Sequence, residues 1–90
     1  MSGYSVNRTG KIITVGNSAY SESFSSHLIR CVALSHLMKR VEIMLAGEKE
    51  AHHFGEYNPE TLVALRDAIV SAWNESLQED AGAAVHPHVA

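Results

Sequence analysis

The chain has 90 residues, of which 46% are hydrophobic, and seven Lys and Arg residues stand against ten Asp and Glu residues, for a formal net charge of −3. A chain of this length makes one small domain that buries about 60–65% of the surface its unfolded form exposes. Its charge excludes an overall polycation for nucleic acid or anionic membranes. No apolar run approaches the ~20 residues of a membrane span, and we expect no membrane contact. One cysteine excludes an internal disulfide, and the first eleven residues lack the apolar core of a secretion signal. We therefore expect a cytoplasmic protein.

Residues 1–17 have the pattern of a β-hairpin or arm. Tyr4 to Val6 and Lys11 to Val15 are rich in β-branched and aromatic side chains, and the residues between them include Gly10. Two such runs joined by a glycine-containing turn favour a hairpin. An arm with one real strand, residues 12–15, remains the alternative.

Residues 11–18 read KIITVGNS. This stretch resembles the strand and Gly-Asn-Ser turn of the AbrB/MazE-like swapped-hairpin DNA-binding domains. The resemblance covers eight residues of ninety and implies a DNA-binding role. In that family another apolar strand and usually a proline follow the turn, whereas Ala19 to Ser23 supplies neither.

Residues 18–46 carry most of the bulky apolar side chains, and Phe24 to Leu45 runs for 22 residues without Pro or Gly. Wound at 3.6 residues per turn, the stretch shows one broad apolar face and predicts a helix over about 22–46 that ends at Gly47. Ile29, Val32 and Ile43 form a second apolar seam with His36 in it. Two apolar faces imply two neighbours, so we expect a central helix.

Residues 47–57 are polar and contain two glycines, which indicates a loop, with Phe54 and Tyr57 folding back over the end of the core. A second helix is predicted over 58–79. Asn58 is a good cap, and Pro59 at the first helical position needs no N–H partner. Apolar residues recur at helical spacing from Leu62 onward. Residues 81–90 are expected to be a disordered tail.

The predicted fold is therefore mostly α. It is a single domain, residues 1–80, with two long antiparallel amphipathic helices (about 22–46 and 59–79) preceded by a short N-terminal β-hairpin or strand. Two helices cannot enclose their own wide apolar faces, so we expect a homodimeric helical bundle. Its interface, or the surface for a heterologous protein, would comprise Ile29, Val32, His36, Ile43, Val63, Val70 and Trp73.

Six histidines raise the question of a metal site. His27 and Cys31 stand four apart, a spacing that on a helix lets both reach one ion, and His52 and His53 are candidates in the loop. Zinc sites need three or four ligands in fixed geometry, and no cluster here supplies them from sequence alone. A thiol well inside a helix also lacks the electropositive setting of a reactive cysteine. We expect no cofactor and no enzymatic activity.

We interpret the chain as a small non-enzymatic interaction protein, a regulator or inhibitor that binds a partner protein through an apolar helical surface. A dimeric DNA-binding regulator or antitoxin is the alternative. Residues 1–45 carry five basic residues against two acids, and residues 46–90 carry two against eight. In the DNA-binding hypothesis Arg8 and Lys11 contact the phosphates of DNA, and the acidic half binds a partner protein. A metal- or thiol-dependent protein built on His27 and Cys31 is the second alternative.

Overall fold

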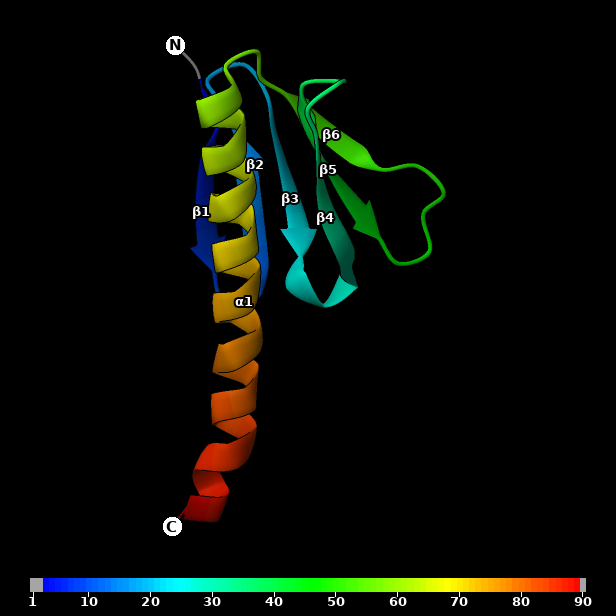
Figure 1. Ribbon diagram of the computed structural model, residues 1–90. Helices are drawn as coiled ribbons and strands as arrows, with labels where there is room; N and C mark the ends of the chain where they lie inside the picture. Colours follow the sequence, from blue (N-terminus) through cyan, green and yellow to red (C-terminus); the bar gives the residue numbers. More distant parts are fainter. Residues whose placement is uncertain (1–2, 90) are drawn as a thin grey trace.

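The computed structural model describes residues 3–89, with side chains up to Glu79. Within this range the chain forms six strands, one short 3-10 helix and one long α-helix (Figure 1). In chain order these are β1 (Ser5–Thr9), β2 (Ile12–Gly16), β3 (Ser21–Ser25), η1 (Ser26–Leu28), β4 (Ile29–Ser35), β5 (Arg40–Leu45), β6 (His52–Gly55) and α1 (Pro59–Val89).

The strands form two antiparallel sheets of three, in the orders β1-β2-β3 and β4-β5-β6. The expected N-terminal hairpin is formed by β1 and β2, with Thr9 opposite Ile12. Gly10 in its turn has φ of 61°, a left-handed conformation that glycine adopts without a Cβ penalty. Every connection between neighbouring strands of a sheet is short, so each sheet is a local meander.

The long helix predicted over residues 22–46 is wrong, because this segment forms β3, η1, β4 and β5. In β5 the residues alternate between buried and half-buried from Arg40 to Leu45, which is the period of a strand with one face on a core. β-Branched residues at 29, 32, 41 and 43 suit such a strand. The two-helix hairpin, and the helical bundle through which we expected a dimer, therefore do not form.

The short helix η1 joins the two sheets. The N–H of Ser26 donates to the carbonyl of Lys11 at 2.8 Å, which extends the pairing of β2 with β3. The N–H of Ala46 donates to the carbonyl of Leu28 at 2.7 Å, which extends the pairing of β4 with β5. Three residues thus carry the chain from one sheet to the other while the main-chain ladders continue into the junction.

Helix α1 is the third layer around a single core. It corresponds to the helix expected over residues 58–79, with the Asn58 side chain accepting from the N–H groups of Glu60 and Thr61 as its cap. The structure extends it to Val89, and Ala90 of the expected tail lies outside the described residues. The helix contacts β1 and β4 most extensively. The buried apolar core comprises Ile13, Val15, Phe24, Ile29, Val41, Ile43, Leu45, Phe54, Leu62, Leu65, Ile69 and Ala72.

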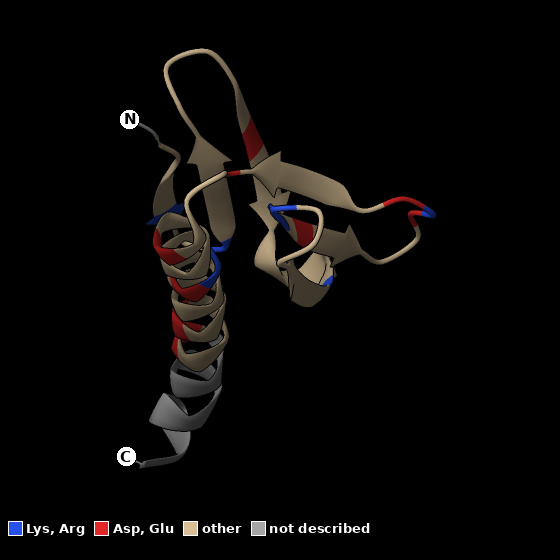
Figure 2. Ribbon diagram, turned by 45° about the horizontal axis from the view of Figure 1, so that its top comes forward, with Lys and Arg blue, Asp and Glu red and all other residues tan. Residues whose placement is uncertain are grey.

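Charged residues lie on the outside of this assembly. Figure 2 shows acidic residues spaced along α1 and a cluster of charged residues at the projecting turn between β5 and β6. On the helix, Arg8 of β1 approaches Glu75 at 3.6 Å and Glu79 at 3.2 Å. These ion pairs link β1, the outer strand of the first sheet, to α1.

Candidate functional site

Three large apolar side chains are exposed to solvent at one end of the molecule. Leu37 and Met38 lie in the turn between β4 and β5 and are 88% and 55% exposed. Tyr57, which lies between β6 and α1, is 85% exposed. The two turns meet, and we call these three residues the apolar tip.

The main chain holds the apolar tip in place. The N–H of Met38 donates to the Ser35 hydroxyl at 3.0 Å, and the N–H of Glu56 donates to the carbonyl of Lys39 at 2.9 Å. The second bond ties the two turns to each other. The ammonium group of Lys39 lies 5.7 Å from the centre of the Tyr57 ring, within the range of a cation–π contact. The tip is therefore built on anchored turns, at the head of the capped helix.

A hollow of about 350 Å³ lies between the two turns. Its walls are Leu37, Met38, Lys39, Gly55, Glu56 and Tyr57. Lone exposed apolar residues are ordinary on a protein surface, but a cluster of large ones rimmed by charged groups marks a contact site. The arrangement can seat an apolar side chain of another molecule beside one acidic and one basic group.

The residues expected to form an interface are divided between the core and the surface, where Val32 and Val70 line one groove between β4 and α1. Ile29 and Ile43 are buried in the core, where they face the other sheet and α1 instead of a partner. Val32 is half-buried on β4, and His36 is exposed in the turn beside Leu37. On α1, Val63, Val70 and Trp73 are half-buried. The apolar seam was a product of helical winding and disappears when the segment is a pair of strands.

The candidate metal ligands also lie apart. His27 is in η1 and Cys31 is exposed on β4, so the helical spacing that would bring them together is absent. His52 and His53 are consecutive on β6, and consecutive strand residues point to opposite faces. Among the residues whose side chains the structure describes, no group of three or more His, Cys, Asp and Glu is placed to hold a metal ion.

His52 instead connects the two sheets through contacts with Glu22 and Glu48, and we call these two contacts the clasp of His52. Its Nδ1 lies 2.7 Å from Glu22 on β3, and its Nε2 lies 2.7 Å from Glu48 in the turn before β6. The hydrogen bond to Glu48 is the largest effect on the pKa of His52 and raises it above its usual 6.5. Burial, the second effect, lowers the pKa, and the hydrogen bond and charge of Glu22 raise it further. The ring also packs edge-on against Phe24. Sequence spacing gave no sign of this partnership with Glu22, thirty residues away.

The two residues of the DNA-binding alternative lie near one another on the first hairpin. Lys11 is exposed in the turn between β1 and β2. Arg8 is half-buried, and its guanidinium is engaged by Glu75 and Glu79 of α1. The charge of Arg8 is therefore directed at acidic residues of α1, which Figure 2 shows in red.

Sequence reasoning missed the apolar tip. Leu37 and Met38 fall on the broad apolar face of the helix predicted over residues 22–46, and the sequence predicts that Phe54 and Tyr57 both cover the core, where Phe54 alone is buried. The available signal was a four-residue polar-and-apolar run, His36 to Lys39, between two segments rich in β-branched residues.

Comparison with known protein families, with curated proteins and with solved structures gives no match to this chain. In the described residues, α1 does not combine the length and apolar character needed to cross a membrane.

Proposed function

We propose that this chain is a small non-enzymatic interaction protein, a regulator or inhibitor, that binds a partner protein through its apolar tip. The observation that carries the proposal is the exposure of Leu37, Met38 and Tyr57 on two turns that are hydrogen-bonded to each other. The proposal keeps the class of function expected from the sequence and moves the binding surface from helix faces to the end of the sheet.

The energetics of the tip suit a compact binding site. Fully burying one large apolar side chain contributes about 1.5–3 kcal/mol. Most binding energy at protein interfaces comes from a few central residues, with Tyr among the enriched types. Because hydrogen bonds to Ser35 and Lys39 anchor the turns, their main chain has little conformational freedom left to lose on binding.

The partner's complementary surface follows from the groups around the tip. An apolar pocket would receive Leu37 and Met38, while Lys39 and Glu56 at the rim favour a polar edge carrying both charge signs. We place this activity in the cytoplasm, which the single exposed thiol of Cys31 supports, since disulfides rather than free thiols prevail in oxidising compartments.

Photo-crosslinking from the tip tests the proposal. A benzophenone amino acid replaces Leu37 in the full chain, and a second protein carries it at Lys49, another exposed position, in the turn between β5 and β6. The expected result is a crosslinked partner from position 37 that position 49 does not capture. The partner is then purified, and its affinity for the wild-type chain is measured by calorimetry.

The decisive comparison uses Leu37→Asp and Lys49→Asp against that purified partner. We expect the first substitution to weaken binding at least tenfold and the second to leave it within twofold. Equal affinities for both variants, with the fold intact by circular dichroism, would remove the apolar tip as the binding site.

A further inference from the structure

Strand β4 is an edge strand of its sheet. It is the longest strand in the described chain, seven residues from Ile29 to Ser35, and it pairs only with β5. Edge strands carry a row of main-chain donors and acceptors that another extended chain can pair with. The hydrogen bonds elsewhere in the sheet show which residues of β4 turn their main-chain N–H and C=O groups toward the open edge.

The N–H of Glu56 donates to the carbonyl of Lys39, so the main-chain groups of Lys39 face β6. Main-chain direction alternates along an antiparallel strand, so the groups of Glu42 and Met44 face β4. On β4, Ala33 pairs with Glu42 and Cys31 pairs with Met44. The bond from Ala46 to Leu28 obeys the same alternation.

The remaining residues of β4, Val32 and Leu34, therefore turn their N–H and C=O groups away from β5. No main-chain hydrogen bond within the described residues takes up these groups. Both side chains lie on the inner face, half-buried beside the core. The open edge is thus centred on the middle of β4, before the turn that carries Leu37 and Met38.

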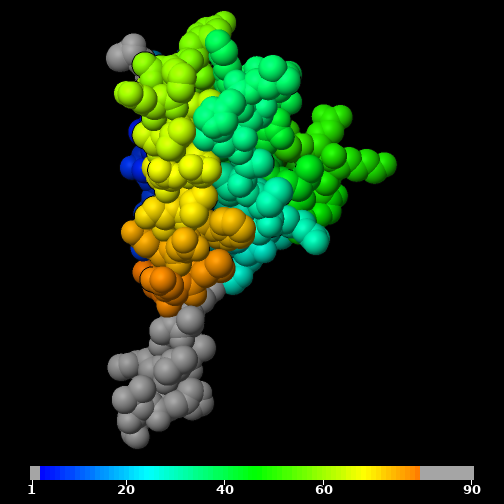
Figure 3. All heavy atoms as spheres, viewed as in Figure 1, coloured from blue at the N-terminus to red at the C-terminus, as the bar shows by residue number. Residues whose placement is uncertain are grey.

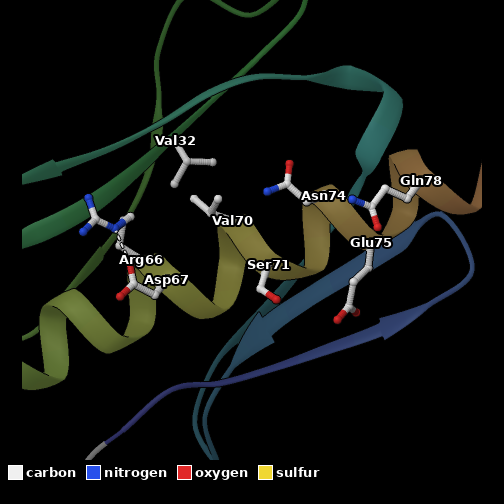
Figure 4. A pocket seen from close by; sticks show the side chains of 8 residues that line it. All are labelled: Val32, Arg66, Asp67, Val70, Ser71, Asn74, Glu75 and Gln78. Carbon is white, nitrogen blue, oxygen red and sulfur yellow. Dashed lines mark hydrogen bonds and ion pairs between the residues drawn. The ribbon is translucent and has the colours of Figure 1, made fainter.

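Figure 3 shows α1 and the region of β4 side by side on one face of the molecule, and a groove lies between them, lined by the residues labelled in Figure 4. Its volume is about 710 Å³, within the ~300–1,000 Å³ of ligand-binding pockets. Val32 and Val70 face each other across it, and Asn74 points to the same side as Val70 (Figure 4). The full lining is Val32, Arg66, Asp67, Val70, Ser71, Asn74, Glu75 and Gln78.

We propose that this groove binds an extended segment of another polypeptide, which adds to the sheet as a strand beside β4. The main-chain groups of Val32 and Leu34 pair with the segment. A small apolar side chain of the segment occupies the space between Val32 and Val70. The side-chain amides of Asn74 and Gln78 form hydrogen bonds with the segment's main-chain groups on the side away from β4. These groups would otherwise lose their hydrogen bonds to water.

The chemistry of the groove selects this occupant. The positive charge of Arg66 is matched by Asp67, at 2.7 Å, and the other polar groups of the wall are amides, a hydroxyl and the carboxylate of Glu75. With no excess of positive charge, the groove does not suit a phosphate backbone or an acidic peptide. Because α1 forms one wall, a single extended chain fits there more readily than a second copy that brings its own helix. This inference is independent of the apolar tip.

Panning a phage-displayed library of random dodecapeptides against the immobilised full chain tests the proposal. Enriched peptides are synthesised with a fluorescent label, and their affinities are measured by fluorescence polarisation. The test variant is Val32→Pro, which removes an outward-facing N–H without breaking the ladder to β5; edge strands accept proline at such positions. We expect at least tenfold weaker binding.

The matched control is Val6→Pro. The bond from Ser26 to Lys11 shows that β2 turns the groups of Ile12 and Thr14 toward β1, so by the same alternation the N–H of Val6 points outward from the other sheet's edge. This variant should bind the peptides like the wild type. Both variants are checked for folding by circular dichroism and thermal unfolding.

Amide hydrogen exchange on the wild-type chain gives a readout that needs no variant. Bound peptide should slow exchange at Val32 and Leu34, while Cys31 and Ala33, already bonded to β5, change little. The proposal is overturned if no peptide is enriched, if the peptides bind Val32→Pro as tightly as the wild type, or if protection appears elsewhere. A concentration-dependent dimer that Val32→Pro abolishes would assign the edge to self-association and overturn it as well.

Discussion

The hydroxyl oxygens of Ser26 and Ser76 lie 2.6 Å apart in the interior of the protein, and each residue is about 1% exposed. Ser26 belongs to η1, where the chain passes from one sheet to the other, and Ser76 lies on the buried face of α1. A single hydrogen bond between side chains fifty residues apart thus joins all three layers at the point where they converge. In this site of the core, each hydroxyl is a polar partner for the other.

Replacing one of these serines should cost more than replacing both. Ser76→Ala leaves the Ser26 hydroxyl buried without its partner, and the expected loss is about 1–3 kcal/mol of unfolding free energy. In the double variant Ser26→Ala with Ser76→Ala no hydroxyl remains unpaired, so the loss should be smaller than for Ser76→Ala alone. Urea unfolding followed by circular dichroism measures each value. Ser71→Ala, on the exposed side of the same helix, is the control and should stay within about 0.5 kcal/mol. Strictly additive losses at 26 and 76 would contradict the pairing.

The clasp around His52 predicts a pH dependence of stability. Glu48 and Glu22 favour the protonated ring, so the folded-state pKa lies above the unfolded value of about 6.5. The stabilisation is therefore complete below pH ~6.5 and is lost as pH rises through the folded pKa. The melting temperature of the wild type should exceed that of His52→Gln more at pH 6 than at pH 9. His53→Gln, on the exposed face of the same strand, keeps both glutamate contacts of His52 and serves as the control for folding. A difference between wild type and His52→Gln that stays constant with pH would show that the clasp is not charged.

Two glycines in strands should respond differently to alanine. A Cβ on Gly16 would clash with the Cβ of Ser21 and lie 2.7 Å from the carbonyl oxygen of Tyr20, where the chain turns tightly between β2 and β3. Part of that obstacle is main chain, so Gly16→Ala should cost about 1–3 kcal/mol, as overpacking typically does. At Gly55 the nearest atom is 3.7 Å away, an ordinary contact, and alanine should be tolerated. Thermal unfolding of both variants checks the difference; equal melting temperatures would mean that the turn relaxes freely.

Local signals predicted the N-terminal hairpin and the start of α1. The hairpin of residues 5–16 rests on a glycine turn between two β-branched runs, and the start of α1 rests on Asn58 and Pro59, whose capping chemistry acts over four residues. Both signals are local in physical origin, because turns and helix caps form among near neighbours in sequence. Such elements can be read without knowing the rest of the fold.

The middle of the chain could not be read in this way. Leu34, Leu37, Met38 and Val41 recur at the spacing of a helix, and Leu and Met are good helix formers. The turn that breaks the segment contains no Gly, Pro, Asn or Asp; Lys39 itself adopts φ of 56°, which is uncommon for such a residue. The segment forms strands because β5 pairs with β4 and β6. The spacing of apolar residues along the sequence does not reveal pairing between separate segments.

The candidate site suffered from the same error. Once residues 34–41 are wound as a helix, Leu37 and Met38 fall on its core face, and nothing marks them as exposed. Their true position depends on a turn bonded through Ser35 and on a second turn that ends at Asn58. The clasp of His52 with Glu22 likewise exists only after the two sheets have come together, which no local pattern specifies.

Two leucines distinguish the apolar tip from the core. Leu45 is 7% exposed at the end of β5, and Leu45→Ala should cost about 2–5 kcal/mol because it removes packed methyl groups and leaves a cavity. Leu37 is 88% exposed and supports nothing in the folded chain, so Leu37→Ala should change the unfolding free energy by less than about 0.5 kcal/mol. Urea denaturation of the purified chain measures both, with the slope against urea confirming that the unfolded surface is unchanged. A loss of 2 kcal/mol at position 37 would mean that its side chain is packed in the free protein, and a packed leucine has no apolar surface left to offer a partner.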